Sequence, residues 1–568
     1  MIISLFEIAS IAFIGPYIGL LADTEISNGI FHKLINYFGF FGERTVMLTS
    51  LGILLVIIFA LKSSFVIFIN AYIIRFSLNL QIRLRSLLMQ SYQQLPYRIY
   101  LERNSSEYIY SIQSLTTVYS SLIAETLRSS SEIIVGLGII SILAWTNFYA
   151  LIFFIVLLGI IVFGYDLFFK EKLKKFGSNI NRNETAMMQG INEGIEGLKE
   201  IRVLGVESYF FKKMHKAALS LNQNLFRQQV IQTAPRFLLE FFIVLFVILL
   251  VIGVVFLGNN QKELLPTLGI FGVAAVRLLP STNMLSGCLV RFRFSRDAVS
   301  RLHDDFKKVI DLNKESFSQI QKSQPVSNKS DVLTNSFNSL ELKNLIFRYP
   351  NSLKDAIQGI SLRIHAGESV GFIGASGAGK TTLVNLLLGL LEPQSGIINY
   401  NGKSLIENIE VWRNQTAYLP QDIFLIDNSL KSNVALGFED EDIEDKRLKE
   451  ALGQARLSEL VSQLPKGVDT LLGEHGTRLS GGQRQRVAMA RAFYHRRGVL
   501  VMDESTSSLD HETEREIVEE IKHLKGSITL IVIAHRLTTV EHCDRIYRLE
   551  NGLIVEEGSP EQLFSKVS

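Results

Sequence analysis

Residues 374–382, with the sequence GASGAGKTT, have the residue types and spacing of a loop that binds phosphate. An apolar run at 369–373 precedes them and another at 383–391 follows, so a strand, a tight loop and a helix are predicted. The glycines let backbone N–H groups close on an anion, and the helix N-terminus adds positive potential. A chance glycine-rich turn is the alternative, but the order strand, loop, helix argues against it. The residues of this predicted nucleoside triphosphate site are Gly374, Ser376, Gly377, Ala378, Gly379, Lys380, which reaches the terminal phosphates, Thr381, whose hydroxyl can ligate Mg²⁺, and Thr382.

Two carboxylates, Asp503 and Glu504, end the apolar run at 499–502. At the end of the predicted strand, Asp503 would hold Mg²⁺ through water. Glu504 is placed to orient and polarise an attacking water as general base. Hydrolysis of a bound nucleotide by this chemistry would need both carboxylates.

A second helix start that could bind phosphate is predicted at LSGGQ, residues 479–483. Ser480 would cap the helix, while Gly481 and Gly482 would allow an anion to approach closely. Gln483 completes the motif. Within one chain this second motif cannot serve the nucleotide that the first one binds.

With Gln421 before LSGGQ and His535 after it, the order of motifs resembles the ATPase domain of an ABC transporter. The resemblance implies that Tyr349 stacks on adenine, that Gln421 reaches Mg²⁺ and the attacking water, and that His535 contacts the γ-phosphate. It implies ATP and Mg²⁺ as ligands and a homodimer, in which Ser480 of one chain completes the site at Lys380 of the other. From the residues alone, a core tyrosine and a structural histidine remain the alternatives for Tyr349 and His535.

Length and composition favour a membrane protein with more than one domain. The 568 residues are too many for a single core, and 47% of them are hydrophobic. The mean hydropathy of +0.23 is high for a soluble protein. A net charge of +3 provides no global field for binding nucleic acid. Cys288 and Cys543 lie in different contexts, so neither a disulfide framework nor a metal cluster is expected.

Six apolar segments are long enough to cross a bilayer, and Lys and Arg concentrate in two long connections between them. The positive-inside bias places these connections, 75–114 and 170–236, in the cytoplasm. Short helical turns near Pro96 and at 194–207 resemble the coupling loops of exporters. The first segment lacks the positive flank and cleavage site of a signal peptide. The six segments are 1–21, 46–74, 115–145, 148–169, 237–257 and 267–290.

The expected fold is an all-α transmembrane domain of ABC exporter type with six helices, followed by an α/β P-loop nucleotide-binding domain. We expect the first at 1–310 and the second at 339–568, with a Ser-, Asn-, Lys- and Gln-rich linker at 311–338. The resemblance implies a multi-pass protein of the inner membrane with its ATPase domain in the cytoplasm. Exporters carry a cytoplasmic lead-in before the first span, whereas this sequence begins inside that span, so a truncated or misassigned start is expected.

Arg277 suggests the cargo, because it lies about ten residues, roughly 15 Å, into the last span, where an arginine is costly and usually functional. The sequences around Arg75, Arg236 and Arg277 resemble those of bacterial lipid-linked oligosaccharide flippases. This implies a polyprenyl-pyrophosphate-linked oligosaccharide as substrate, whose phosphates suit guanidinium groups. The alternatives are a structural pair of Arg277 with Glu7 or Glu240, an exporter of a peptide, lipid or hydrophobic drug, and an ATP-gated channel or regulator.

Overall fold

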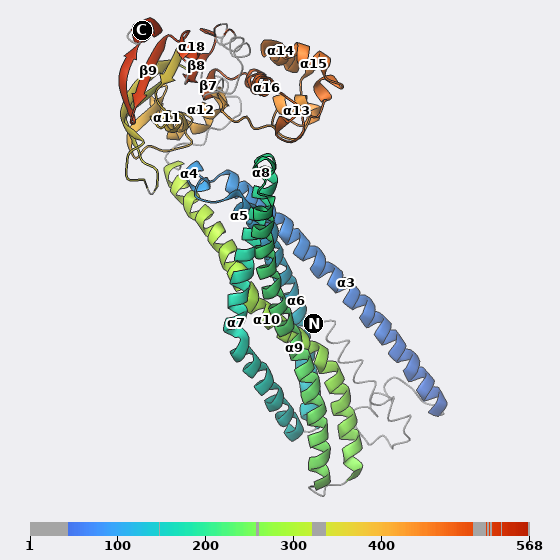
Figure 1. Cartoon of the computed structure of the whole chain (residues 1–568). Helices are drawn as coiled ribbons and strands as arrows, with labels where there is room; N and C mark the ends of the chain where they lie inside the picture. Colours follow the sequence, from blue (N-terminus) through green and yellow to red (C-terminus); the bar gives the residue numbers. More distant parts are fainter. Residues whose placement is uncertain are drawn as a thin grey trace. The chain divides into compact units, whose positions relative to one another are not determined.

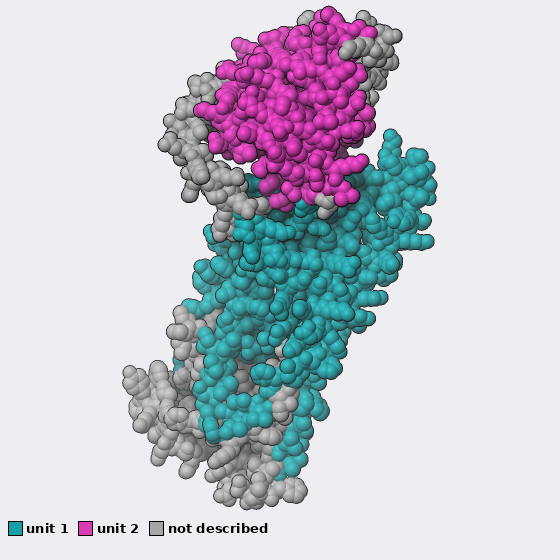
Figure 2. Space-filling view, turned by 90° about the vertical axis from the view of Figure 1, so that its left-hand side faces the viewer, with its two compact units in different colours: residues 1–95, 100–313 teal, residues 96–99, 314–568 magenta. Residues whose placement is uncertain are grey.

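A computed structural model describes residues 44–146, 148–256, 261–320, 337–350, 352–503, 519, 522, 525–534 and 537–565. The first predicted span, Glu504 and His535 lie outside these residues. The chain forms two compact units, shown in teal and magenta in Figure 2. Unit 1 comprises Met1–Leu95 and Tyr100–Asn313, and unit 2 comprises Pro96–Ile99 and Lys314–Ser568.

Long helices make up the described part of unit 1 (Figure 1). The described residues of the five apolar segments predicted from residue 46 onward lie within these helices, apart from Leu115, because uninterrupted runs of Leu, Ile, Phe and Val satisfy their backbone groups most simply as helix. By length and composition, one stretch of the described residues, Leu48–Gln93, qualifies as a membrane span. The long helices are α3 (Arg44–Gln93), α6 (Thr116–Thr146), α7 (Phe148–Glu196), α9 (Glu207–Phe256) and α10 (Gln261–Ile320).

Short elements occupy the connections that the charge bias assigns to the cytoplasm. Pro96 separates α3 from the next helix, since proline disfavours helical conformation in the residue before it. Asn104 caps α5 by accepting a hydrogen bond from the Ser106 N–H. The short elements are α4 (Tyr97–Tyr100), α5 (Ser105–Tyr110), the π-helix η1 (Ser111–Leu115) and α8 (Leu198–Leu204).

Two sheets form the framework of unit 2. The first is antiparallel in the order β2-β1-β4-β5, and the second has the order β10-β9-β3-β8-β7-β6 with parallel pairing from β9 to β6. A turn at Asn551-Gly552 joins β9 to β10, with φ of 48° and 81°. The strands are β1 (Ser339–Phe347), β2 (Ile357–His365), β3 (Ser369–Ile373), β4 (Ser395–Tyr400), β5 (Lys403–Ser404), β6 (Thr416–Leu419), β7 (Val499–Asp503), β8 (Thr529–Ile533), β9 (Arg545–Glu550) and β10 (Leu553–Gly558).

The helices of unit 2 pack in two apolar cores. In one core, Leu383 and Leu387 of the helix after β3 meet Leu342 of β1 and Phe372 of β3, so this helix lies between the two sheets. The other core surrounds the helix that follows LSGGQ. The helices are α11 (Lys380–Leu387), α12 (Ile409–Gln415), α13 (Leu430–Val434), α14 (Asp445–Gln454), α15 (Ser458–Gln463), α16 (Gly481–Tyr494), α18 (Leu537–Val540) and α19 (Pro560–Phe564).

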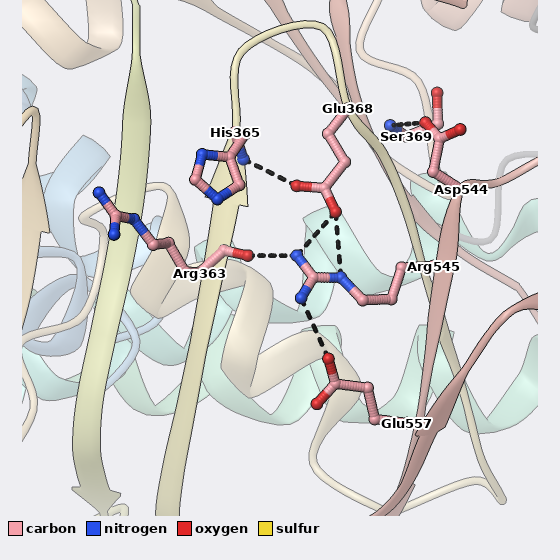
Figure 3. A network of polar contacts seen from close by, with 7 residues as sticks. All are labelled: Arg363, His365, Glu368, Ser369, Asp544, Arg545 and Glu557. Atoms are coloured by element: carbon pink, nitrogen blue, oxygen red, sulfur yellow. Dashed lines mark hydrogen bonds and ion pairs between the residues drawn. The ribbon is translucent and has the colours of Figure 1, made fainter.

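Arg545 joins the two sheets (Figure 3). From β9 it donates to one oxygen of Glu368, at 3.0 Å from Nε and 2.7 Å from Nη2. It also donates to Glu557 on β10 at 3.0 Å and to the Arg363 carbonyl on β2 at 2.6 Å. Glu368 accepts a further hydrogen bond from the His365 N–H at 2.8 Å. We call these contacts the Arg545 network; they connect the sheets just before β3 begins.

Candidate nucleotide site

The glycine-rich loop connects β3 to α11, as predicted. All five residues of β3 are buried, which fixes where the loop starts. Gly374 and Gly379 have φ of 153° and 102°, and a Cβ added to them would lie 2.3 Å from the Leu549 carbonyl and 2.6 Å from the Ala356 carbonyl. Only glycine therefore fits at these two positions. Ser376 and Gly377 between them are exposed, so the loop presents its backbone to the outside.

Lys380 is the first residue of α11 and is only 4% exposed. Its Nζ donates to the carbonyls of Gly374 and Ala375 at 2.9 and 3.1 Å. The ammonium group thus lies against the loop that it follows, where it adds a positive charge to the N-terminus of the helix. Thr381 beside it is exposed.

Tyr349 reaches the same helix from the other sheet. It follows β1, and its ring packs edge-on against Phe347 with centroids 5.0 Å apart. Its hydroxyl lies 3.3 Å from the Thr382 hydroxyl. The structure therefore brings Tyr349 to the helix that carries Lys380 and Thr381.

Asp503 and Gln421 follow neighbouring parallel strands. Asp503 ends β7 and is 5% exposed, and β6 pairs beside it with Leu419 opposite Met502. Gln421 is exposed just after β6. Because parallel strands end at the same edge of a sheet, both side chains start from one edge.

Tyr418 on β6 also contacts this edge, and the sequence analysis did not assign it a role. Its hydroxyl donates to Asp503 Oδ2 at 3.3 Å. Burial, and then the Asp503 charge, raise the pKa of Tyr418 above its usual value, so the phenol remains a donor at neutral pH. The sequence feature that could have indicated this contact is the position of Tyr418 on the strand that ends just before Gln421.

The oxygen donors Thr381, Gln421 and Asp503 are of the type that Mg²⁺ prefers. Among the described residues no group of three or more His, Cys, Asp or Glu side chains could hold a metal. A site with one or two carboxylates is typical of Mg²⁺ that is bound mainly by substrate phosphate oxygens and water. Glu504 and His535 are not described, but β7 and β8, which precede them, pair with Asp503 opposite Ile533.

Ser480 is the N-cap of α16, as predicted. Its hydroxyl oxygen accepts a hydrogen bond from the Gln483 N–H at 3.3 Å, and Gln483 Oε1 accepts one from the Ser480 N–H at 2.9 Å. This capping box fixes the start of the helix. Ser480 itself is exposed, and its hydroxyl can still donate its proton to an anion.

The three membrane arginines lie on different helices. Arg75 is exposed on α3, and Arg236 on α9 pairs with Glu240 at 3.0 Å. Arg277 lies on α10, and its side chain is outside the description. Glu240 is therefore paired with Arg236, one turn away on the same helix. Among the described residues, Arg75 and Arg236 do not share an ion-pair partner.

A group of charged residues between α6 and α10 was missed by the sequence analysis. Glu125 of α6 pairs with Arg291 of α10 at 2.7 Å, and the Ser281 hydroxyl of α10 donates to Glu132. Arg128 lies between the two glutamates, on the same helical face. We call these five residues the α6–α10 polar cluster. The signal was three charges at helical spacing inside an apolar segment, where charge is costly and usually functional.

Comparisons with known proteins agree with this architecture. The family model described as the ABC transporter transmembrane region matches residues 1–273, and the model described as ABC transporter matches 357–507. A solved structure, "Structure of a bacterial Atm1-family ABC exporter with ATP bound", matches with a TM-score of 0.79 and 21% identity over 100% of this chain and 96% of that one. At this identity the match shows the fold.

Several similar proteins carry the name "ATP-dependent lipid A-core flippase". Those of Coxiella burnetii and Saccharophagus degradans are 27% and 28% identical to this chain over 93% of its length and 87% of theirs. That of Ralstonia nicotianae is 44% identical, but the match spans only 40% of this chain and 39% of that protein.

Proposed function

Because the chain belongs to the ABC transporters, with a transmembrane region before an ATP-binding ATPase domain, we propose that it flips a phosphorylated, sugar-bearing lipid across the inner membrane. The observation that carries this proposal is charge inside the apolar helices: the α6–α10 polar cluster, together with Arg277. The guanidinium of Arg277 suits a lipid whose headgroup carries phosphate, whereas the two arginines of the cluster are balanced by Glu125 and Glu132. The names of the similar proteins support a lipid cargo.

We assign roles in ATP hydrolysis as part of this proposal. Lys380 binds the terminal phosphates, and Tyr349 stacks on adenine. Glu504 polarises the attacking water, Gln421 orients it, and His535 contacts the γ-phosphate. Thr381, Gln421 and Asp503 would hold Mg²⁺, which when bound neutralises phosphate charge.

The proposal retains the predicted division of the chain. Residues 1–310 form the six-helix membrane domain, 311–338 the linker, whose first ten residues continue helix α10, and 339–568 the ATPase domain, which lies in the cytoplasm. The basic connections 75–114 and 170–236 support this orientation, because the residues next to the cytoplasmic ends of membrane helices are enriched in Lys and Arg.

We expect a homodimer, since one chain has one membrane half and one ATPase half, whereas each ATP needs two phosphate-binding motifs. Lys380 of one chain and Ser480 of the other would contact the same nucleotide. Sedimentation in detergent should give the mass of two chains under conditions where ATP is hydrolysed. A stable monomer that hydrolyses ATP at the full rate would contradict the dimer.

Two cargoes fit the charged helices. One is the polyprenyl-pyrophosphate-linked oligosaccharide that the sequence analysis implies. The other is lipid A-core, which the names of the similar proteins indicate. Both combine long apolar tails with phosphate and sugar, so vesicles containing one lipid or the other distinguish them. If neither lipid moves while hydrophobic cations or peptides do, the chain exports one of those instead, and an ATP-gated channel would show little basal ATP turnover.

Replacing Arg277 by alanine should lower flipping of the accepted lipid at least about tenfold, because a buried charged hydrogen bond of about 1.5–3 kcal/mol is lost. Basal ATP hydrolysis should stay within about twofold. Arg227→Ala, at an exposed position on α9, is the matched control and should change neither activity. Unimpaired flipping would show that Arg277 does not handle the headgroup, and loss of both activities would indicate a structural ion pair.

A further inference from the structure

Asp305 of α10 is a buried carboxylate that binds three donors, which come from α3, η1 and the turn between α4 and α5. It is 3% exposed. Its Oδ2 accepts hydrogen bonds from the Tyr92 hydroxyl at the end of α3, at 2.7 Å, and from the Ser111 hydroxyl of η1, at 2.9 Å. Its Oδ1 accepts from Arg103 Nη1 at 2.8 Å. We call these four residues the Asp305 cluster.

The Asp305 cluster lies beside an apolar core. Leu88 of α3, Leu115 of η1 and Leu302 of α10 are at most 3% exposed and belong to that core, with Tyr92 packed against it. A carboxylate in such surroundings is stable only when its oxygens are paired. Losing one donor would therefore leave a poorly solvated charge, so the cluster holds its members in one arrangement.

Aromatic rings fix the arginine of the cluster. Arg103 lies over the Tyr108 ring, 5.4 Å from its centroid. The Tyr108 ring in turn packs edge-on against Tyr92 at 4.8 Å and stacks on Tyr100 at 5.7 Å. Glu107 adds an ion pair to Arg103 at 3.4 Å. Tyr108 thus contacts Tyr92, which precedes α4, and Arg103, which follows it.

The residues of the Asp305 cluster lie close to the positions where the chain passes between unit 1 and unit 2. Tyr92 precedes, and Arg103 follows, the four residues Pro96–Ile99, which belong to unit 2 whereas their flanking residues belong to unit 1 (Figure 2). Asp305 lies on α10, the helix along which the chain passes from unit 1 into unit 2. The Asp305 carboxylate therefore binds residues on both sides of the loop at 96–99. Asp305 itself lies on α10, which is the other place where the chain passes from unit 1 to unit 2.

A neighbouring chain of hydrogen bonds extends the cluster to α7. The Tyr110 hydroxyl donates to Asn181 of α7 at 2.7 Å, and Asn181 donates to Asp297 of α10 at 2.8 Å. Arg301 donates to the same Asp297 oxygen at 2.9 Å. A displacement of α5 is thereby passed to α7 and α10 together.

We propose that Asp305 is a positioning residue that couples ATP hydrolysis in unit 2 to movement of the unit 1 helices. It holds the loop at 96–99, α10 and η1 as one body, so that a displacement of the loop moves the helices and does not merely bend the connection. This role rests on the proposed function in one respect, that ATP hydrolysis drives movement of the helices; it does not depend on which lipid is carried.

The test compares Asp305→Asn with Asp304→Asn in the full-length protein in lipid vesicles. Asp304 is the exposed neighbour on α10 and serves as the matched control. Hydrogen exchange of peptides from α6, α7 and α10 is measured with and without ATP and vanadate, beside ATP turnover and lipid flipping. For Asp305→Asn we expect ATP turnover within about twofold of wild type, loss of the nucleotide-dependent exchange change in unit 1 but not in unit 2, and at least tenfold fewer lipids moved per ATP.

A double mutant separates coupling from folding. If the charge pair is the coupling contact, Arg103→Gln added to Asp305→Asn should cost no further transport. The inference is overturned if Asp305→Asn behaves like Asp304→Asn, or if ATP turnover, transport and thermal stability fall together. A wild-type protein that moves neither lipid but shows the exchange change in unit 1 would reject the cargo proposal and leave the Asp305 test intact.

Discussion

Replacing Glu504 by glutamine is expected to lower ATP turnover at least about 100-fold, the scale of a lost general base, while ATP and Mg²⁺ binding stay within about twofold. The amide keeps the shape of the side chain but cannot take a proton from water. The variant should therefore accumulate with ATP bound and its two chains closed on each other.

Single-turnover hydrolysis and equilibrium ATP binding, measured on the same preparation, check this expectation. Glu550→Gln, at an exposed position at the end of β9, is the control and should hydrolyse ATP at the wild-type rate. If Glu504→Gln keeps near wild-type turnover, Glu504 is not the base and the assignment of the motif is wrong.

Lys380→Ala should weaken ATP binding at least about 100-fold, which corresponds to roughly 2.7 kcal/mol. Two effects add up here. The phosphates lose a cation in a largely buried site, and the carbonyls of Gly374 and Ala375 lose the donor that holds the loop. The alanine also leaves the N-terminus of α11 without its charged side chain.

Titration with a fluorescent ATP analogue measures this loss, and Lys403→Ala, at an exposed position on β5, is the control. Thermal unfolding without nucleotide tests whether the variant is folded. An affinity within about threefold of wild type in a folded variant would show that Lys380 serves the loop alone and does not contact the phosphates.

The local parts of the site could be predicted from the sequence. Strand β3, the glycine-rich loop and α11 follow one another within about twenty residues, so apolar runs and glycines specify them directly. Ser480 as N-cap is also set by neighbouring residues, and the structure confirms it; the turn at Asn551-Gly552 is of the same local kind.

Contacts between distant parts of the chain could not be predicted in this way. Tyr92 and Asp305 are 213 positions apart, and no period or spacing relates them. The pair of Glu125 with Arg291 depends on which faces of α6 and α10 meet, and the spacing of residues along either helix does not specify this. The Tyr418–Asp503 contact follows from strand order, which skips across the sequence.

The Arg545 network limits how unit 2 can deform when it binds and hydrolyses nucleotide (Figure 3). Shear between the sheets would break the bond of Arg545 to the Arg363 carbonyl on β2, while Glu368 and Glu557 hold the arginine on its own sheet. Tyr349 follows β1 in one sheet and the glycine-rich loop follows β3 in the other, so this bond helps to fix the spacing between the two proposed ends of the nucleotide site. Alternate residues of β7 and β8 belong to the two apolar cores, so α16, which starts next to Ser480, packs on the opposite face of the same sheet from α11.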